Sequence, residues 1–185
     1  MSVVAVPVAG SHWSASDQAL RVAVVAALSA TVMLFASLVS AYLVRRSFED
    51  WRPAPALWPL PLMAWGLLAS VGIEVASRAE GTRRHVGFIA LVFASALYLL
   101  TVLGVIGSTV TGPRGLAAPH DAFVALLLGV HVLHAVLGAV FAFWALRDGK
   151  ALRLSSGEPF ILARLVTHFL TALLLGILFV LFVLR

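Results

Sequence analysis

Hydrophobic residues fill five long runs that contain no charged side chain. The runs cover residues 22–44, 57–73, 86–106, 122–146 and 165–184. A helix needs about 20 apolar residues to cross a bilayer, and each run comes close to that length or exceeds it. The pattern predicts an all-α fold, a polytopic membrane protein built as a bundle of five transmembrane helices.

The second run is the shortest, and we expect its helix to continue past Glu74. Pro59 and Pro61 fall in its first turn, where a missing N–H costs least. The predicted helices are therefore 22–44, 58–77, 86–106, 122–146 and 165–184, all within one transmembrane domain, 19–185. Residues 1–18 hold no basic residue and so lack the start of a secretory signal, which predicts a short cytoplasmic tail.

The basic residues predict how the chain is oriented. Counted on alternate sides of the five spans, eight Lys and Arg lie on the side of the N-terminus and five on the other. The larger group is Arg21, Arg78, Arg83, Arg84, Arg147, Lys150, Arg153 and Arg164. Because positive charge accumulates on the cytoplasmic side, we expect the N-terminus inside and the C-terminus outside.

Composition supports this interpretation and narrows the chemistry. Hydrophobic residues make up 62% of the chain and charged residues 11%, whereas soluble domains carry about 25% charge. The net charge of +5 is explained by these basic loops and does not point to nucleic acid. The chain has no cysteine, which excludes disulfides, thiolate metal sites and thiol nucleophiles.

Four ionisable residues fall inside or beside the apolar runs, namely Glu74, His131, His134 and His168. Such residues are costly in a bilayer and are functional candidates by default. For Glu74 we favour an ion pair with Arg78 at the membrane interface, because i, i+4 spacing brings the two side chains together. The alternative is a proton-carrying carboxylate.

The histidines share helix faces with small residues, a pattern typical of helix packing in membranes. The predicted faces are His131, His134, Ala135, Gly138 and Ala142 on the fourth helix, His168, Thr171 and Ala172 on the fifth, and Ser29, Ala36 and Ser40 on the first. We interpret the histidines as hydrogen-bonded packing residues or lipid contacts. Ligation of haem or metal is the competing hypothesis, although no Asp or Glu lies within either histidine-bearing run.

No motif of a catalytic site occurs in the chain. There is no glycine-rich phosphate loop, no metalloprotease His-Glu pair and no Gly-x-Ser-x-Gly turn, so we expect no catalytic residues. A transporter is a further alternative, but the chain lacks the inverted repeat that many transporters show.

Three segments, in order, resemble one family, subunit III of the haem-copper respiratory oxidases. The first is the stretch from Met33 to Arg46, Met-Leu-Phe-Ala-Ser-Leu-Val-Ser-Ala-Tyr-Leu-Val-Arg-Arg, which is similar to the family's Met-Leu-Phe-x-x-Leu-x-x-Ala-Tyr-Leu. The second is the Gly-x-His-x-x-His-x-x-x-Gly pattern formed by Gly129, His131, His134 and Gly138. The third is Thr167-His168-Phe169, where the family has Trp-His-Phe. The run from Trp58 to Leu62 also fits.

This resemblance implies the short, five-helix bacterial form of subunit III in the cytoplasmic (inner) membrane. The chain would then be a non-catalytic accessory subunit without a cofactor of its own, while haem and copper reside in the partner, catalytic subunit I. The resemblance also implies bound phospholipid and a supporting role in complex stability and proton uptake. It implies structural or lipid-site roles for His131, His134 and His168.

The chain departs from the family where carboxylates are usual. Thr31 stands near the place of the first-helix Glu, Thr171 stands for an Asp of the fifth helix, and the third helix lacks the family's Gln and Glu. Two alternatives stay open beside the oxidase subunit. One is a related partner of a nitric oxide reductase, and the other is a haem b-binding anchor using His131 or His134 with His168.

Overall fold

A computed structural model describes residues 15–51, 58–112, 115–148 and 158–183. The helices are α1 (Ala15–Arg45), α2 (Pro59–Arg78), α3 (Gly81–Thr111), α4 (Pro119–Asp148) and α5 (Glu158–Phe182), with a short 3₁₀ turn at Gly115–Ala117. All five are long and apolar enough to cross a membrane, and the described residues include no strand. The chain is therefore an all-α, multi-pass membrane protein, as its hydrophobic pattern predicts.

Most helices are longer than predicted, and these bounds were wrong. Helix α3 begins five residues before the predicted 86 and ends five residues after 106, and α5 begins at Glu158 instead of 165. Helix α1 begins at Ala15, inside the predicted tail; the rest of that tail lies outside the described residues. The uncharged runs mark the hydrocarbon crossing, whereas helical hydrogen bonds continue among charged side chains at the interface.

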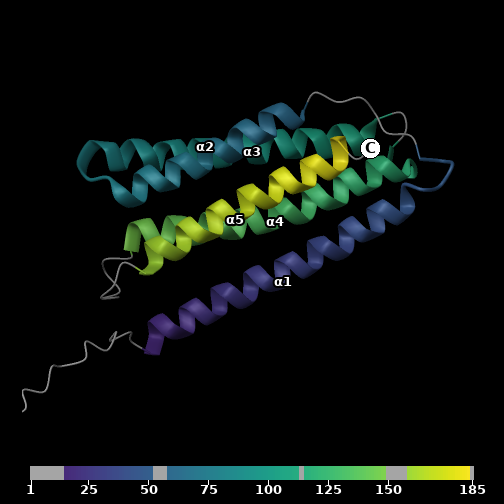
Figure 1. The fold of residues 1–185 in the computed structure, drawn as a ribbon. Helices are drawn as coiled ribbons and strands as arrows, with labels where there is room; N and C mark the ends of the chain where they lie inside the picture. Colours follow the sequence, from purple (N-terminus) through teal and green to yellow (C-terminus); the bar gives the residue numbers. More distant parts are fainter. Residues whose placement is uncertain (1–14, 52–57, 113–114, 149–157, 184–185) are drawn as a thin grey trace, which may run out of the picture.

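The helices form an up-and-down bundle with two close antiparallel pairs, α2 with α3 and α4 with α5 (Figure 1). Among the described helices, α1 contacts α4 and α5 and neither α2 nor α3, and Figure 1 shows its first half diverging from the bundle. Helix α1 begins at the opposite end of the bundle from the end of α5, as five crossings require. We call the end where α2 ends and α5 begins the Arg78 end.

Helices α2 and α3 touch through their backbones at two glycines. A Cβ atom added to Gly72 would lie 2.7 Å from the Leu91 nitrogen, and one added to Gly87 would lie 2.5 Å from the Ala76 nitrogen. Both distances are shorter than any real contact, so only glycine allows this approach. Only two residues separate the end of α2 at Arg78 from the start of α3 at Gly81. This tight turn places Gly81 at a φ of 56°, a conformation that favours glycine.

The predicted packing face of the fourth helix points into the bundle. His131, Gly138 and Ala142 are buried, and His134 and Ala135 are partly buried. A Cβ atom on Gly138 would lie 2.6 Å from a Leu170 methyl group of α5. The small residues therefore bring α4 and α5 together, as a small-residue stripe in a membrane helix predicts.

The predicted packing face of the first helix was wrong. Ser29, Ala36 and Ser40 are all exposed, and α1 instead contacts the bundle through Thr31, Phe35 and Tyr42. Because α1 stands away from the other helices along its first half, large side chains are needed to reach them. Thr31 satisfies its hydroxyl within α1, by donating to the Ala27 carbonyl at 2.8 Å.

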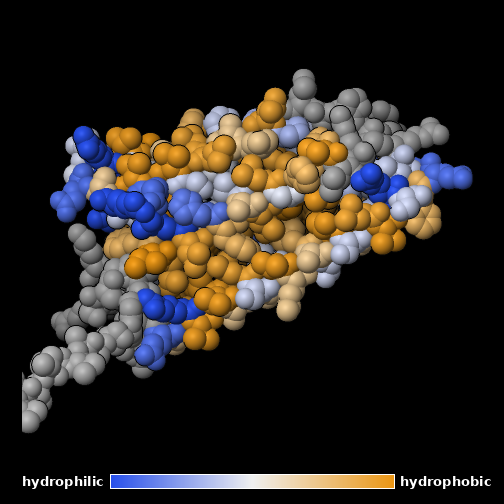
Figure 2. Space-filling model, viewed as in Figure 1, coloured by the Kyte–Doolittle hydropathy of each residue, from blue (hydrophilic) through white to orange (hydrophobic). Residues whose placement is uncertain are grey.

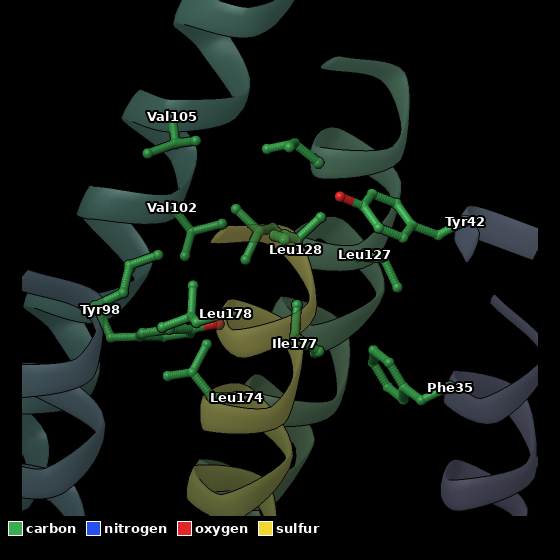
Figure 3. Close-up of a cluster of buried hydrophobic side chains, with 13 residues drawn as sticks. Phe35, Tyr42, Tyr98, Val102, Val105, Leu127, Leu128, Leu174, Ile177 and Leu178 are labelled. Atoms are coloured by element: carbon green, nitrogen blue, oxygen red, sulfur yellow. The ribbon is translucent and has the colours of Figure 1, made fainter. Parts of the chain in front are cut away.

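The largest buried cluster joins α1, α3, α4 and α5, with one residue from α2. Figure 3 shows Phe35 and Tyr42 of α1 pointing toward leucines of α4 and α5, with α3 side chains on the opposite side. The cluster consists of Phe35, Tyr42, Leu62, Tyr98, Val102, Val105, Val124, Leu127, Leu128, Leu174, Ile177, Leu178 and Leu181. Tyr42 also packs edge-on against Trp51 and Phe123 near the end of α1.

An ion pair connects the last residue of α1, Arg45, to Asp50 in the loop that follows. The Arg45 guanidinium donates to Asp50 Oδ1 at 2.6 Å and also to Oδ2. These hydrogen bonds favour the ionised carboxylate and hold the pKa of Asp50 below its ordinary value.

The contact between α2 and α3 leads to a first prediction. We expect Gly87→Ala to destabilise the protein by about 1–3 kcal/mol, because the new methyl group meets backbone that cannot move aside. Gly104→Ala is the matched control on the same helix, since a Cβ atom there meets nothing within 4 Å. Thermal unfolding in detergent measures both variants, and equal midpoints would contradict the backbone contact.

Candidate functional site

His131 lies at the centre of the bundle and joins three helices. Its Nδ1 accepts a hydrogen bond from the Tyr98 hydroxyl of α3 at 2.5 Å, and its Nε2 donates to the Leu170 carbonyl of α5 at 3.0 Å. The residue is only 2% exposed, so both bonds lie away from water. Each ring nitrogen therefore has a partner, and the imidazole acts as a neutral cross-link between helices.

His134 lies one turn further along α4 and bonds within its own helix. Its Nδ1 donates to the Val130 carbonyl at 2.8 Å, and its ring packs edge-on against Phe35 of α1. Phe35 also makes an edge contact with His131. The two histidines of the Gly-x-His-x-x-His pattern thus face α1 and the core, where they set the spacing of α1 from α4.

Polar side chains in the same part of the bundle join α2 to α5 and α2 to α3. The Ser70 hydroxyl donates to Thr171 Oγ1 at 2.8 Å, and the Thr171 hydroxyl donates to the Gly66 carbonyl at 3.1 Å. The Trp65 indole of α2 donates to the Thr101 hydroxyl of α3 at 3.2 Å. Each bond satisfies a polar group where water is absent, and each also fixes one helix against another.

Near the Arg78 end, Glu74 of α2 is paired with three side chains. Arg164 of α5 donates from Nε to Oε2 at 2.7 Å and from Nη2 to Oε1 at 3.0 Å. Arg78 forms the predicted i, i+4 ion pair with Oε1, and His168 Nε2 lies 3.3 Å from Oε2. The carboxylate therefore connects α2 to α5 by a two-pronged pair, the strongest geometry that Arg and Glu can form.

Sequence reasoning missed Arg164 as the main partner of Glu74. It was counted as a loop charge because the predicted span began at residue 165, whereas α5 begins at Glu158. The predicted face of the fifth helix was also partly wrong. Thr171 is buried, but Ala172 is exposed and His168 bonds Glu74 at the surface of the bundle. Tyr98 and Ser70 were missed as well, because no spacing rule connects them to residues so distant in sequence.

A cavity of about 250 Å³ lies between the two helix pairs. Its walls are mainly apolar, and its exposed rim includes Ala96 of α3 and Val136 and Val140 of α4. The polar side chains of the lining already have protein partners: His131, Thr171, Tyr98 and Trp65 bond other helices, while Ser95 and Thr167 bond carbonyls of their own helices. A cavity of this shape and polarity suits a hydrocarbon chain better than a polar substrate.

Comparison with known proteins adds no relative. No protein-family model, curated protein or solved structure matches the chain. Among residues 15–51, 58–112, 115–148 and 158–183, no three His, Asp or Glu side chains form a group that could hold a metal ion.

The His131 cross-link gives a second prediction. In a double-mutant cycle of Tyr98→Phe and His131→Leu, we expect a coupling energy between about 0.6 kcal/mol, the average for hydrogen bonds between membrane helices, and about 1.7 kcal/mol, the largest value among them. Each single variant leaves one buried polar atom without its partner, whereas the double variant removes both atoms. Unfolding in detergent measures the coupling, and strictly additive effects would contradict the bond.

Proposed function

We propose that this protein is a non-catalytic accessory subunit of the subunit III type, attached to the catalytic subunit of a bacterial haem-copper oxidase. The observation that carries the proposal is His131, whose two ring nitrogens both bond neighbouring helices. The motif residues of the resemblance thus act as parts of a scaffold. A scaffold of this kind supports the stability and the proton uptake of the catalytic partner without reacting itself.

In this proposal the chain crosses the bacterial cytoplasmic membrane with its N-terminus inside and its C-terminus outside. Haem and copper belong to the partner subunit. Two of the described ionisable groups within the spans, Glu74 and His131, support this division, because both are fully engaged with protein partners. A haem ligand at His131 would have to give up the buried hydrogen bond of whichever ring nitrogen bound the iron, which counts against His131 in the alternative of a haem b anchor.

Bound phospholipid is the second part of the proposal. The cavity between α3 and α4 has an exposed rim on the lipid-facing surface and apolar walls. An acyl chain entering it would fill the gap between the two helix pairs and replace contacts that an empty cavity lacks. Lipid would then act as a structural component of the subunit.

Gentle detergent extraction of native membranes, followed by pull-down of this chain, tests the first part. We expect a haem-copper catalytic subunit to be recovered with it. Recovery of a nitric oxide reductase would support the related alternative, and recovery of the chain without either enzyme would overturn the proposal. A reduced-minus-oxidised spectrum of the isolated chain is the control, since a haem b anchor shows a sharp band and a scaffold subunit does not.

A cavity-filling variant tests the lipid part. We expect Val136→Trp to reduce the phospholipid that co-purifies per chain, because the indole occupies the rim of the cavity. Leu137→Trp is the matched control, because Leu137 is the next residue in the sequence, is 60% exposed and does not line the cavity. Mass spectrometry of extracted lipid gives the ratio, and equal lipid content in both variants would contradict acyl-chain binding in the cavity.

A further inference from the structure

The carboxylate of Glu74 has no acceptor position left. Its Oε1 accepts from Arg164 and Arg78, and its Oε2 accepts from Arg164 and His168. A carboxylate offers about four lone-pair positions, and all of them are taken. The carboxylate therefore holds two guanidinium groups in fixed positions beside each other.

The two guanidinium groups retain unused donors and unbalanced charge. Arg164 uses Nε and Nη2 on Glu74, and Arg78 uses Nη2, so each keeps further N–H groups. Two guanidinium charges against one carboxylate leave one positive charge in excess. Both side chains reach the surface, with 64% of Arg78 and 27% of Arg164 exposed. A second anion can therefore approach them without displacing Glu74.

The position of the cluster along the membrane normal identifies the anion. Helix α2 has 20 residues, and at about 1.5 Å per residue it spans about 30 Å, the thickness of the hydrocarbon layer. Arg78 is its last residue, so the cluster lies where hydrocarbon meets lipid headgroups. Figure 2 shows hydrophilic side chains entering the apolar surface from this end, between α2 and α5.

Other charged residues of the Arg78 end do not take part in the same way. Arg84 donates to the Leu146 carbonyl at 2.9 Å and lies over the Phe160 ring, so it is held by α4 and α5. Arg83 and the acidic Glu80 are exposed in the turn region between α2 and α3. The pair on Glu74 combines two fixed guanidinium groups with an opening toward lipid.

We propose that Arg78 and Arg164 form an oxyanion site of the phosphate class on the α2/α5 face, with the phosphodiester of an anionic phospholipid as its occupant. Planar guanidinium forks match phosphate oxygens in two-pronged geometry. This site deepens the lipid-binding part of the proposed function and lies apart from the cavity between α3 and α4. It also explains why two arginines surround a single carboxylate.

Binding to the purified full chain in detergent tests the proposal by native mass spectrometry. The probes are dioctanoylphosphatidylglycerol, dioctanoylphosphatidylcholine and inorganic phosphate. The variant Glu74→Gln with Arg164→Gln removes one negative and one positive charge, so the net charge of the chain is unchanged. Arg83→Gln is the control, because it removes one exposed positive charge at the same end and leaves the cluster intact.

We expect the wild-type chain to bind phosphatidylglycerol more tightly than phosphatidylcholine. The double variant should weaken the former by about tenfold, as loss of charged hydrogen bonds implies. Arg83→Gln should change it less than about twofold, because a single exposed charge acts only through screened, long-range attraction. Competition by inorganic phosphate at similar concentration, with the same dependence on Arg164, would keep the site but make soluble phosphate its ligand.

Two results would overturn the site. One is an equal loss of phosphatidylglycerol binding in the double variant and in Arg83→Gln, which would indicate general attraction to basic loops. The other is undiminished binding in a double variant whose unfolding midpoint shows that it is folded. Since the assay uses the isolated chain, its result is independent of whether an oxidase co-purifies.

Discussion

Polar groups inside a bilayer have no water to bond, and this constraint organises the whole bundle. The chain meets it with two kinds of hydrogen bond: some polar side chains, such as Thr31 and His134, bond a carbonyl of their own helix, and others bond a neighbouring helix. Tyr98, His131 and the Leu170 carbonyl join α3, α4 and α5, while Ser70 and Thr171 join α2 to α5. Each bond between helices satisfies a polar atom and also fixes the register of the two helices. The hydrogen bonds that satisfy polar groups therefore also hold the bundle together.

Close helix packing adds to these hydrogen bonds, and the helices differ in how closely they pack. Gly72 and Gly87 bring α2 and α3 into backbone contact. Gly138 lets the backbone of α4 approach side chains of α5 closely. Helix α1 has no comparable contact and attaches through large side chains, Phe35 and Tyr42. The protein is thus two tight helix pairs, a cavity between them and one peripheral helix, an arrangement that suits a subunit whose surfaces bind other molecules.

The ion pair of Glu74 with Arg164 shows how such a bundle handles charge. A lone carboxylate at this depth would be costly, but a two-pronged guanidinium partner from α5 and a second from Arg78 compensate it. The same compensation leaves positive charge at the headgroup level. In the proposed site, the interaction that stabilises the fold also provides the surface that binds anionic lipid, which would link the proposed scaffold role to the surrounding membrane.

The sequence by itself determined the number of helices, their approximate positions, the small-residue face of α4 and the Glu74–Arg78 pair. These features depend on local periodicity and on the thickness of a bilayer, both of which are visible along the chain. Tertiary structure alone decided that Arg164 binds Glu74, that Tyr98 binds His131, and that α1 presents Phe35 instead of Ser29, Ala36 and Ser40. Arg164 lies 90 residues from Glu74, and His131 lies 33 residues from Tyr98. The face that α1 presents depends on how far this helix stands from the bundle. A local sequence pattern carries no information on either kind of relation.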